Sequence, residues 1–310
     1  MLYRVAAADA LSTQRQSVWD LCYRATGSAA DADMLLRDCL TRAVEHPRVE
    51  RDAGERPPQL TRSAAILAMD AVRQRKRRKY VGCWLPSPVE TGSSASREPR
   101  SSTGSDGPRY DAVESSSMAF LRALEALDPR ERVVFLMCDA YGVTPQDAAA
   151  ALELTSASAR AALQRARRKM HAYDATHEAP TPDVQERTGE VLRDCWACLL
   201  RHHAGRLEKM LTPDAQLCFD GGGEFVAPLA PVCGSARMAR ILLKFAEGTE
   251  PMGFGFRMLN GLPAVLGMSP VRSRWARHFV FRVETRDGLV SEVQAVMASA
   301  KLTAVRFDSA

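Results

Sequence analysis

The sequence predicts a multidomain protein in which two all-α helical domains are followed by one α+β domain. Helical periodicity with strong capping signals dominates residues 10–80 and 118–172, whereas strand-like alternation occurs only after residue 210. Between the helical domains, residues 81–117 are rich in Ser, Gly, Pro and Arg, and a flexible linker is expected from Ser87 onward. A chain of 310 residues is long enough for two or three such domains.

The first domain, residues 10–80, is expected to contain three helices. Gly27 ends the first helix, and Ser28 followed by Asp31 forms a capping signal for the second. A buried stripe at positions i, i+4 and i+7 of the second helix is formed by Leu36, Leu40 and Ala43.

The third helix of this domain, expected from about Gln59 to Lys79, ends in a run of basic residues. Cations are favoured at a helix C-terminus by the helix dipole, which is a purely structural explanation. Clustered bases are also the electrostatic footprint of a phosphate-binding surface. On the second explanation, the DNA-binding residues expected here are Arg73, Arg75, Lys76 and Arg77.

The second domain, residues 118–172, has the pattern of a helix-turn-helix. Asp128-Pro129 and Thr144-Pro145 each supply an N-cap and a proline at the first helical position, and Gly142 separates the two helices. A longer helix follows, with Ser156 as its expected cap. Its expected buried face consists of Ala159, Leu163, Ala166 and Met170. A short helix, a tight turn and a longer basic helix together predict DNA binding.

The opposite face of this longer helix is small and basic. Ala157 and Ala161 allow close approach to a DNA groove, and the free N–H groups at the helix start can hold a phosphate. Arginine and glutamine side chains on this face have the reach for base edges and phosphates. The DNA-binding residues expected from this pattern are Ser156, Ser158, Arg160, Gln164, Arg165, Arg167 and Arg168.

The third domain, residues 184–310, begins with an amphipathic helix and continues with strands. Residues 278–284 and 289–297 alternate apolar and polar side chains, and Arg286-Asp287-Gly288 between them is a hairpin turn signal. A curved antiparallel sheet is therefore expected. The Gly221-Gly222-Gly223 run lacks the Lys-Ser/Thr of a phosphate loop and predicts a bend where another backbone approaches closely.

No catalytic or metal-binding constellation is identified in the third domain. Cys195, Cys198 and His202 share a helix face, but a zinc site needs four ligands and a second ligand pair is missing. No motif links the remaining candidates for catalysis, which are Asp214, Asp220 and His278. We therefore predict no enzyme activity, no metal site and no cofactor.

The eight cysteines are scattered along the chain, as expected for reduced thiols that fill cores. No segment has the apolar length of a signal peptide core or of a membrane span. A cytoplasmic protein without a membrane partner is expected.

Several segments resemble one family. LDPRERVVFLMCDAYGVTPQDAAAALELTSASARAALQRARRKM (Leu127 to Met170) resembles the DNA-binding region four of sigma-70 factors, and GSAADADMLLRDCLTR (Gly27 to Arg42) is similar to their region two. YVGCWLPSPVE (Tyr80 to Glu90) resembles a linker motif of one subgroup, which carries a SnoaL-like extension. The extension's motifs resemble MLTPDAQLCFDGGGEF (Met210 to Phe225) and LNGLPAVL (Leu259 to Leu266). The resemblance indicates an extracytoplasmic-function sigma factor with a SnoaL-like α+β cone at its C-terminus.

This resemblance implies two macromolecular partners. In the family, region four binds the upstream promoter element, and region two binds the clamp of the RNA polymerase core. The polymerase-binding residues implied for this chain are Asp31, Asp33, Leu36 and Asp38. Because Asp33-Met34 stands where the family usually has Glu-Asp, weaker polymerase binding is expected.

The resemblance also implies regulation in cis by the C-terminal domain. Trp84 and Leu85 are large apolar residues beside a polar segment and need a place to bury, and a glycine surface can seat an indole. We expect an interdomain clasp whose population shifts with a signal or small ligand in the cone. Its residues are Trp84, Leu85, Pro86, Asp220, Gly221, Gly222, Gly223, Asn260, Gly261 and Pro263.

Two other functions remain open from the sequence. One is a one-component helix-turn-helix regulator with a ligand-binding cone, which would act without engaging polymerase. The other is a SnoaL-like isomerase with a helical appendage. Binding to core polymerase separates a sigma factor from the first alternative.

Overall fold

The computed structural model describes residues 2–45, 59–78, 80–91, 108–249, 253–270 and 275–307, with side chains from Gln14 onward. These residues form two compact units. The first contains the described residues up to Arg78 together with 108–177, and the second contains 80–91 and the described residues from Glu178 on. The segment 80–91 therefore belongs to the second unit.

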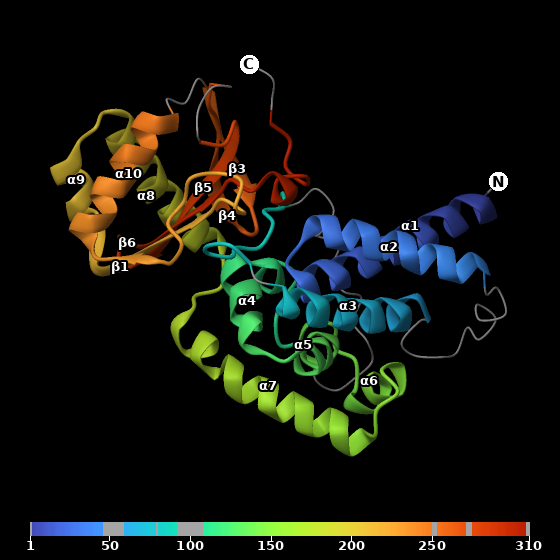
Figure 1. The fold of residues 1–310 in the computed structure, drawn as a ribbon. Helices are drawn as coiled ribbons and strands as arrows, with labels where there is room; N and C mark the ends of the chain where they lie inside the picture. Colours follow the sequence, from blue (N-terminus) through green and yellow to red (C-terminus); the bar gives the residue numbers. More distant parts are fainter. Residues whose placement is uncertain are drawn as a thin grey trace. The chain divides into compact units, whose positions relative to one another are not determined.

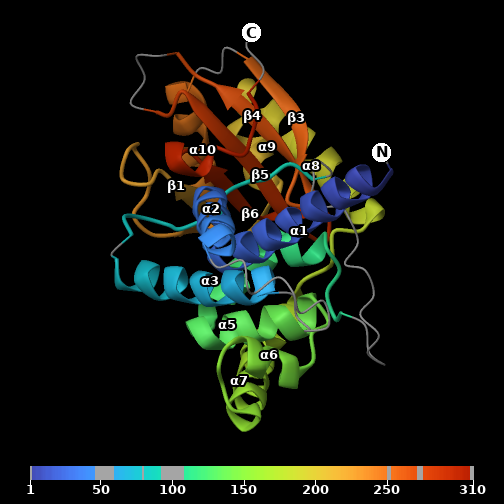
Figure 2. The same ribbon diagram turned by 90° about the vertical axis from the view of Figure 1, so that its right-hand side faces the viewer.

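The first unit is helical throughout its described part. Its helices are α1 (Leu2–Thr26), α2 (Ala29–Glu45), α3 (Gln59–Arg77), α4 (Met118–Ala123), α5 (Pro129–Phe135), α6 (Pro145–Ala151) and α7 (Ser156–Thr176). Three single turns complete it, two of 3₁₀ type at Glu114–Ser116 and Leu124–Ala126 and one of π type at Leu136–Ala140. Helices α1, α2 and α3 pack on one another, and α7 packs on α5 and α6 (Figures 1 and 2).

Helix α2 begins as the sequence predicts, but its buried stripe differs. The Ser28 hydroxyl accepts a hydrogen bond from the Asp31 N–H at 3.1 Å, which confirms the capping signal. The predicted stripe of Leu36, Leu40 and Ala43 was wrong, because these side chains are only half-buried. The residues that pack inward are Ala29, Ala32, Leu35 and Cys39. Small alanines at the helix start allow close helix packing, so the inward face is rotated by one residue from the expected one.

The helix-turn-helix has the predicted elements with one shifted cap. Thr144 caps α6 by accepting from the Asp147 N–H at 3.1 Å, and Gly142 has the positive φ of +66° that ends the preceding helical segment. The cap of α7 is Thr155, whose hydroxyl accepts from the Ser158 N–H at 3.2 Å, and not Ser156. An N-cap bonds two or three residues ahead, so the one-residue shift puts Ser156 inside the first turn.

Helix α7 also extends beyond residue 172, where the second domain was expected to end, since the helix ends at Thr176. Tyr173 in this last stretch is buried and its ring packs 5.5 Å from that of Phe120 and 6.3 Å from that of Tyr110. Aromatic packing of this kind stabilises the additional helical turn.

The second unit is a helix-covered sheet. Its helices are α8 (Pro182–Leu200), α9 (Ala204–Lys209) and α10 (Ser235–Thr249), and its strands are β1 (Leu211–Asp220), β2 (Val232–Cys233), β3 (Gly253–Leu259), β4 (Leu262–Met268), β5 (His278–Arg286) and β6 (Leu289–Val296). The strand order is β2-β1-β6-β5-β4-β3. The expected antiparallel sheet is in fact mixed, because β1 pairs in parallel with β6. Figure 1 shows the three helices gathered beside the sheet, in agreement with the contacts of α8 with β4 and β5 and of α10 with β1.

Two tight hairpins shape the sheet. Asp287 and Gly288 have φ of +54° and +77° between the paired residues Arg286 and Leu289, which confirms the predicted turn. The β3–β4 hairpin turns in the same way at Asn260 and Gly261, with φ of +50° and +79°. Asn-Gly is a strong hairpin signal, which sequence reasoning had treated only as a family motif.

An apolar core fills the space between the sheet and its helices. Its largest members are the aromatic residues Trp196, Phe219, Phe245, Phe279 and Phe281. Cys195 and Cys198 belong to the same core, and burial raises the pKa of the Cys195 thiol to about 12. Within the described ranges, no group of three His, Cys, Asp or Glu residues is placed to hold a metal ion. No described helix is long and apolar enough to cross a membrane.

Candidate nucleic-acid interface and linker contact

The outer face of α7 carries the side chains predicted to bind DNA. Arg160, Gln164 and Arg168 are exposed, and none of them has a side-chain hydrogen bond or ion pair to another described residue. Ala157 and Ala161 lie on the same stretch of helix, where Ala157 is exposed and Ala161 is half-buried. Three long polar side chains beside small ones can reach a groove without steric obstruction.

Other basic residues of α7 are held by acidic residues of the first unit. The Arg165 Nε donates to Glu131 Oε1 at 2.8 Å, and Lys169 Nζ donates to Glu131 Oε2 at 2.7 Å. Arg167 donates to both carboxylate oxygens of the buried Asp139, at 2.9 and 2.6 Å. Arg165 and Arg167, both predicted to bind DNA, thus also anchor α7 to the preceding helices.

The basic residues at the end of α3 also differ from one another in their contacts. Arg73 pairs with Asp70 on its own helix at 2.6 Å, and Arg77 is exposed. Arg75 and Lys76 instead contact residues of the second helical region. The four residues predicted here to bind DNA therefore do not form one free surface in this structure.

The contacts of Arg75 belong to a polar seam at the C-terminal end of α1. Arg75 donates to the carbonyl of Thr26 at 2.6 Å and to Glu125 at 2.5 Å. The buried Arg132 donates to the carbonyl of Ala25 at 2.9 Å and to Glu125 at 2.8 Å. Burial alone would raise the pKa of Glu125, but the two guanidinium groups hold it below its ordinary value.

Arg24, on α1, makes further hydrogen bonds to residues of the second helical region. Its guanidinium is buried and donates to Ser115 Oγ at 2.9 Å, to Tyr141 OH at 2.8 Å and to the carbonyl of Ala112 at 3.1 Å. We call Arg24, Arg75, Glu125 and Arg132 the α1 seam. Through it, the helical region of α1–α3 docks on the region of α4–α7.

The residues predicted to bind polymerase lie on the side of α2 away from its buried stripe. Asp33 and Asp38 are exposed, and Asp31 and Leu36 are half-buried. Asp33 accepts a hydrogen bond from the indole N–H of Trp19 at 2.7 Å. Met34 is 45% exposed beside them, which is unusual for a large apolar side chain and extends this surface.

In the second unit, residues 80–91 pack on the sheet domain, and we call this packing the linker contact. Asp220, at the end of β1, lies at its centre. Its carboxylate is fully buried and accepts hydrogen bonds from Tyr80 OH, from the Leu85 N–H at 2.7 Å, from the Gly222 N–H at 3.1 Å and from Lys301 Nζ at 2.5 Å. Four donors, one of them cationic, therefore meet this buried carboxylate.

Lys301 is a central residue of this contact that the sequence did not indicate. Its ammonium donates to the carbonyl of Leu85 at 2.5 Å as well as to Asp220, and lies 4.5 Å from the ring centre of Tyr80 and 4.7 Å from that of Trp84. A single lysine between Ala300 and Leu302 has no motif that could have indicated this role. Only the fold brings it to the linker, because it follows β6, which neighbours β1 in the sheet.

The predicted seat of Trp84 on the glycine run was wrong in detail. The Trp84 indole is half-buried and lies against the ammonium group of Lys301. The side chain that approaches Gly223 is Val81, 3.4 Å from where a Cβ would stand. At Gly221 a Cβ would lie 2.6 Å from the carbonyl oxygen of Phe225, so the predicted bend with a close backbone neighbour is present.

The linker also adds a short extended segment to the β3–β4 hairpin. Val89 exchanges two hydrogen bonds with Asn260: its N–H donates to Asn260 Oδ1 at 3.0 Å, and its carbonyl accepts from the Asn260 N–H at 2.9 Å. The Thr91 N–H donates to the carbonyl of Met258 at 2.9 Å, and Thr91 Oγ1 accepts from the Gly261 N–H at 2.8 Å. The Asn-Gly turn thus serves both the hairpin and the linker.

Most of the linker contact is buried. Leu85, Pro86, Ser87 and Val89 are all buried, so the flexible linker expected from Ser87 does not begin before residue 91. Residues 92–107 of that expected linker lie outside the described residues. Its last part, residues 108–117, was wrongly predicted as linker, because it packs in the first unit, where Tyr110 and Ser115 are buried. Pro263, which was predicted for the same contact, packs instead against α8.

Comparison with known proteins finds similar sigma factors. A family model described as Sigma-70, region 4 matches residues 117–170, which include α4 to α6 and most of α7. Over 303 aligned residues the chain is 27% identical to the ECF RNA polymerase sigma factor SigJ of Mycobacterium tuberculosis, covering 93% of this chain and 91% of that relative. Over most of its length the chain is similar to extracytoplasmic-function sigma factors. Both helical regions and the α+β unit of the chain lie within the matched length.

The fold of this chain is shared with a solved protein. The crystal structure of the M. tuberculosis extracytoplasmic function sigma factor SigJ aligns with a TM-score of 0.71 at 22% identity, covering 97% of this chain and all of that one. A second relative, the ECF RNA polymerase sigma factor SigG of M. tuberculosis, is 29% identical over 209 residues, which span 63% of this chain and 56% of SigG. The C-terminal sheet unit is therefore part of the shared architecture.

Proposed function

We propose that this protein directs the RNA polymerase core to specific promoters and that its C-terminal unit regulates this activity in cis. The observation that carries the first part is the outer face of α7. Arg160, Gln164 and Arg168 are left without partners within the described part of the first unit, while the neighbouring Arg165 and Arg167 are held by carboxylates. Free basic side chains on a recognition helix are what contact with promoter DNA requires.

The proposed polymerase-binding surface is the exposed side of α2. It combines the carboxylates of Asp31, Asp33 and Asp38 with the apolar side chains of Leu36 and Met34. A mixed acidic and apolar surface suits an interface with a basic partner groove, because the charges steer the encounter and the apolar groups supply contact area.

The proposed regulation depends on the length of the segment that joins the two helical regions. Residues 79–107, which join α3 to the first described residue of the next region, number 29 and span at most about 100 Å when extended. When 80–91 is bound to the sheet unit, only the 16 residues 92–107 remain to join that bound segment to the next region, with a reach of about 55 Å. The linker contact thereby restrains how far the two helical regions can separate.

A SnoaL-like isomerase is not favoured. The relatives matched over most of the chain are sigma factors, and the space between sheet and helices is filled by aromatic side chains. A one-component regulator would bind DNA without polymerase, and the experiment below distinguishes it.

Transcription in vitro with purified core polymerase and the DNA upstream of the protein's own gene tests the proposal. We expect transcripts that depend on both core and this protein, and co-purification of the two. We expect the variant Asp33→Ala with Leu36→Ala to lose co-purification, whereas Glu186→Ala, at an exposed position of α8, should keep it. DNA binding that is equally strong without core, together with no transcript, would support the one-component regulator instead.

A further inference from the structure

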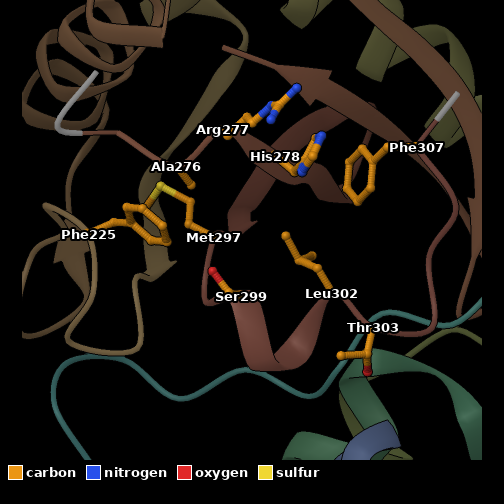
Figure 3. Close-up of a pocket in the computed structure, with 9 residues that line it drawn as sticks. All are labelled: Phe225, Ala276, Arg277, His278, Met297, Ser299, Leu302, Thr303 and Phe307. Carbon is orange, nitrogen blue, oxygen red and sulfur yellow. The ribbon is translucent and has the colours of Figure 1, made fainter. Parts of the chain in front are cut away.

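A cavity of about 220 Å³ lies at one end of the sheet in the second unit. Its walls come from the loop after β1, from the start of β5, from the residue after β6 and from the segment that follows (Figure 3). The residues that line it are Phe225, Ala276, Arg277, His278, Met297, Ser299, Leu302, Thr303 and Phe307.

The lining is apolar with a few polar groups at its edge. Phe225, Met297 and Leu302 supply apolar surface, and the rings of His278 and Phe307 stack with their centres 4.5 Å apart. The lining has no carboxylate, and its one permanently charged side chain is Arg277. Burial, with the nearby Arg277 charge, lowers the pKa of His278, so its imidazole is neutral near pH 7.

We propose that this cavity binds a small organic carboxylate whose apolar body lies among Phe225, Met297 and Leu302 and whose carboxylate meets Arg277. An arginine fork matches a carboxylate geometrically, and Arg277 lies exposed at the rim of the cavity. The volume lies below the range of about 300–1,000 Å³ for drug-sized ligands, so the ligand is a small acid and not a large cofactor.

The cavity shares its walls with the linker contact. The backbone carbonyl of Asp220 accepts from the N–H groups of Met297 and Ala298, at 2.8 and 3.1 Å. Lys301, which holds both Asp220 and Leu85, stands in the turn Ser299–Lys301 between two lining positions. Occupancy of the cavity therefore acts on both partners of the Lys301–Asp220 ion pair. This coupling, unlike the binding itself, rests on the proposed regulation in cis.

The binding test is calorimetric titration of the full chain with benzoate, phenylacetate and hexanoate, and with benzamide as an uncharged match. We expect at least one acid to bind saturably with a dissociation constant of about 1 mM or tighter, and benzamide to bind roughly tenfold more weakly. Arg277→Gln should weaken the acid about tenfold, Leu302→Trp should abolish binding by filling the cavity, and Arg237→Gln, at an exposed position of α10, should change nothing.

Absence of saturable binding by all three acids up to about 20 mM would overturn the site, as would equal binding of benzamide. If Leu302→Trp perturbs the fold by circular dichroism, Ala276→Leu provides a second way to fill the cavity. Amide hydrogen exchange at Leu85 and Val89 tests the coupling: a change of about threefold on adding the acid is expected, and unchanged exchange at saturation would overturn it. Neither measurement involves polymerase or DNA, so failure here is distinct from failure of the sigma-factor role.

Discussion

At the scale of single residues, buried charge is what joins distant parts of each unit. Arg132 and Asp220 are almost completely buried, and each has a hydrogen-bond partner far away in the sequence. Removing one member of such a pair leaves the other charge buried without compensation, which costs more than the pair itself contributes. The effects of substitutions at these positions are therefore specific and large.

The two classes of arginine on α7 are expected to respond differently to substitution. Arg160→Ala and Arg168→Ala should each weaken promoter binding by the polymerase complex by about 1–3 kcal/mol, because they lose base or phosphate contacts. Arg167→Ala should instead lower stability, since it strips the buried Asp139 of its bidentate partner. DNA binding at moderate salt and urea unfolding measure the two effects, with Arg237→Ala as a control. Intact promoter binding by both Arg160→Ala and Arg168→Ala would rule out this assignment.

Asp220→Asn should release the linker while preserving the volume of the side chain. Lys301 then loses its anionic partner, and we expect a cost of about 3 kcal/mol to the linker contact. The readout is amide exchange at Leu85, whose N–H donates to this carboxylate. Asp214→Asn in the same strand is the matched control, because Asp214 is exposed and forms an ion pair with the exposed Arg286. If Leu85 exchanged equally slowly in both variants, Asp220 would not hold the linker.

At the scale of elements, local signals predicted the helices and turns well and the packing faces less well. The caps at Ser28 and Thr144 and the turn at Asp287-Gly288 depend on neighbouring residues only, and all three are present. The buried face of α2 and the parallel pairing of β1 with β6 depend on which distant element packs there. Periodicity alone does not contain that information, and Lys301 was missed for the same reason.

Two substitutions in the β3–β4 turn should affect hairpin stability and linker binding differently. Asn260→Gly keeps a residue that tolerates positive φ but removes the acceptor of the Val89 N–H, so Val89 should exchange faster while the hairpin persists. Gly261→Ala forces a side chain to φ of +79° and should destabilise the hairpin by about 1–2 kcal/mol. Exchange at Val89 and in β4 distinguishes the two outcomes. If both variants changed amide exchange in β4 equally, these separate roles of Asn260 and Gly261 would be contradicted.

The α1 seam should weaken in acid because of Glu125. Its folded pKa lies below the ordinary value of 4.5, so its stabilisation is present above about pH 4.5 and is lost as pH falls through the folded pKa. Glu125→Gln should lower the free energy of unfolding at pH 7 by about 1–3 kcal/mol, because Arg132 stays buried. Urea unfolding measures this, with the exposed Glu45→Gln as control. The difference between wild type and Glu125→Gln should shrink well below pH 4.5, and a constant difference would contradict the role of the charge.

At the scale of the whole molecule, two polar contacts connect distant parts of the chain. The α1 seam docks α1–α3 on α4–α7, and the linker contact ties residues 80–91 to the sheet unit. The order of helical regions, linker motif and α+β unit was predictable from capping signals and motifs. The chemistry of the linker contact was only partly predictable, because Asp220 and Asn260 belong to motifs whereas Lys301 does not.

Transcription in vitro tests the central claim most directly. Full-length wild type, Asp220→Asn and Asp214→Asn are compared at equal concentration with core polymerase and the upstream DNA of the protein's own gene. We predict core-dependent transcripts from all three, with a higher yield from Asp220→Asn because the restraint on the linker is released, and equal yields from wild type and Asp214→Asn. Identical yields from all three proteins, with the Leu85 amide deprotected in Asp220→Asn, would contradict regulation through the linker contact.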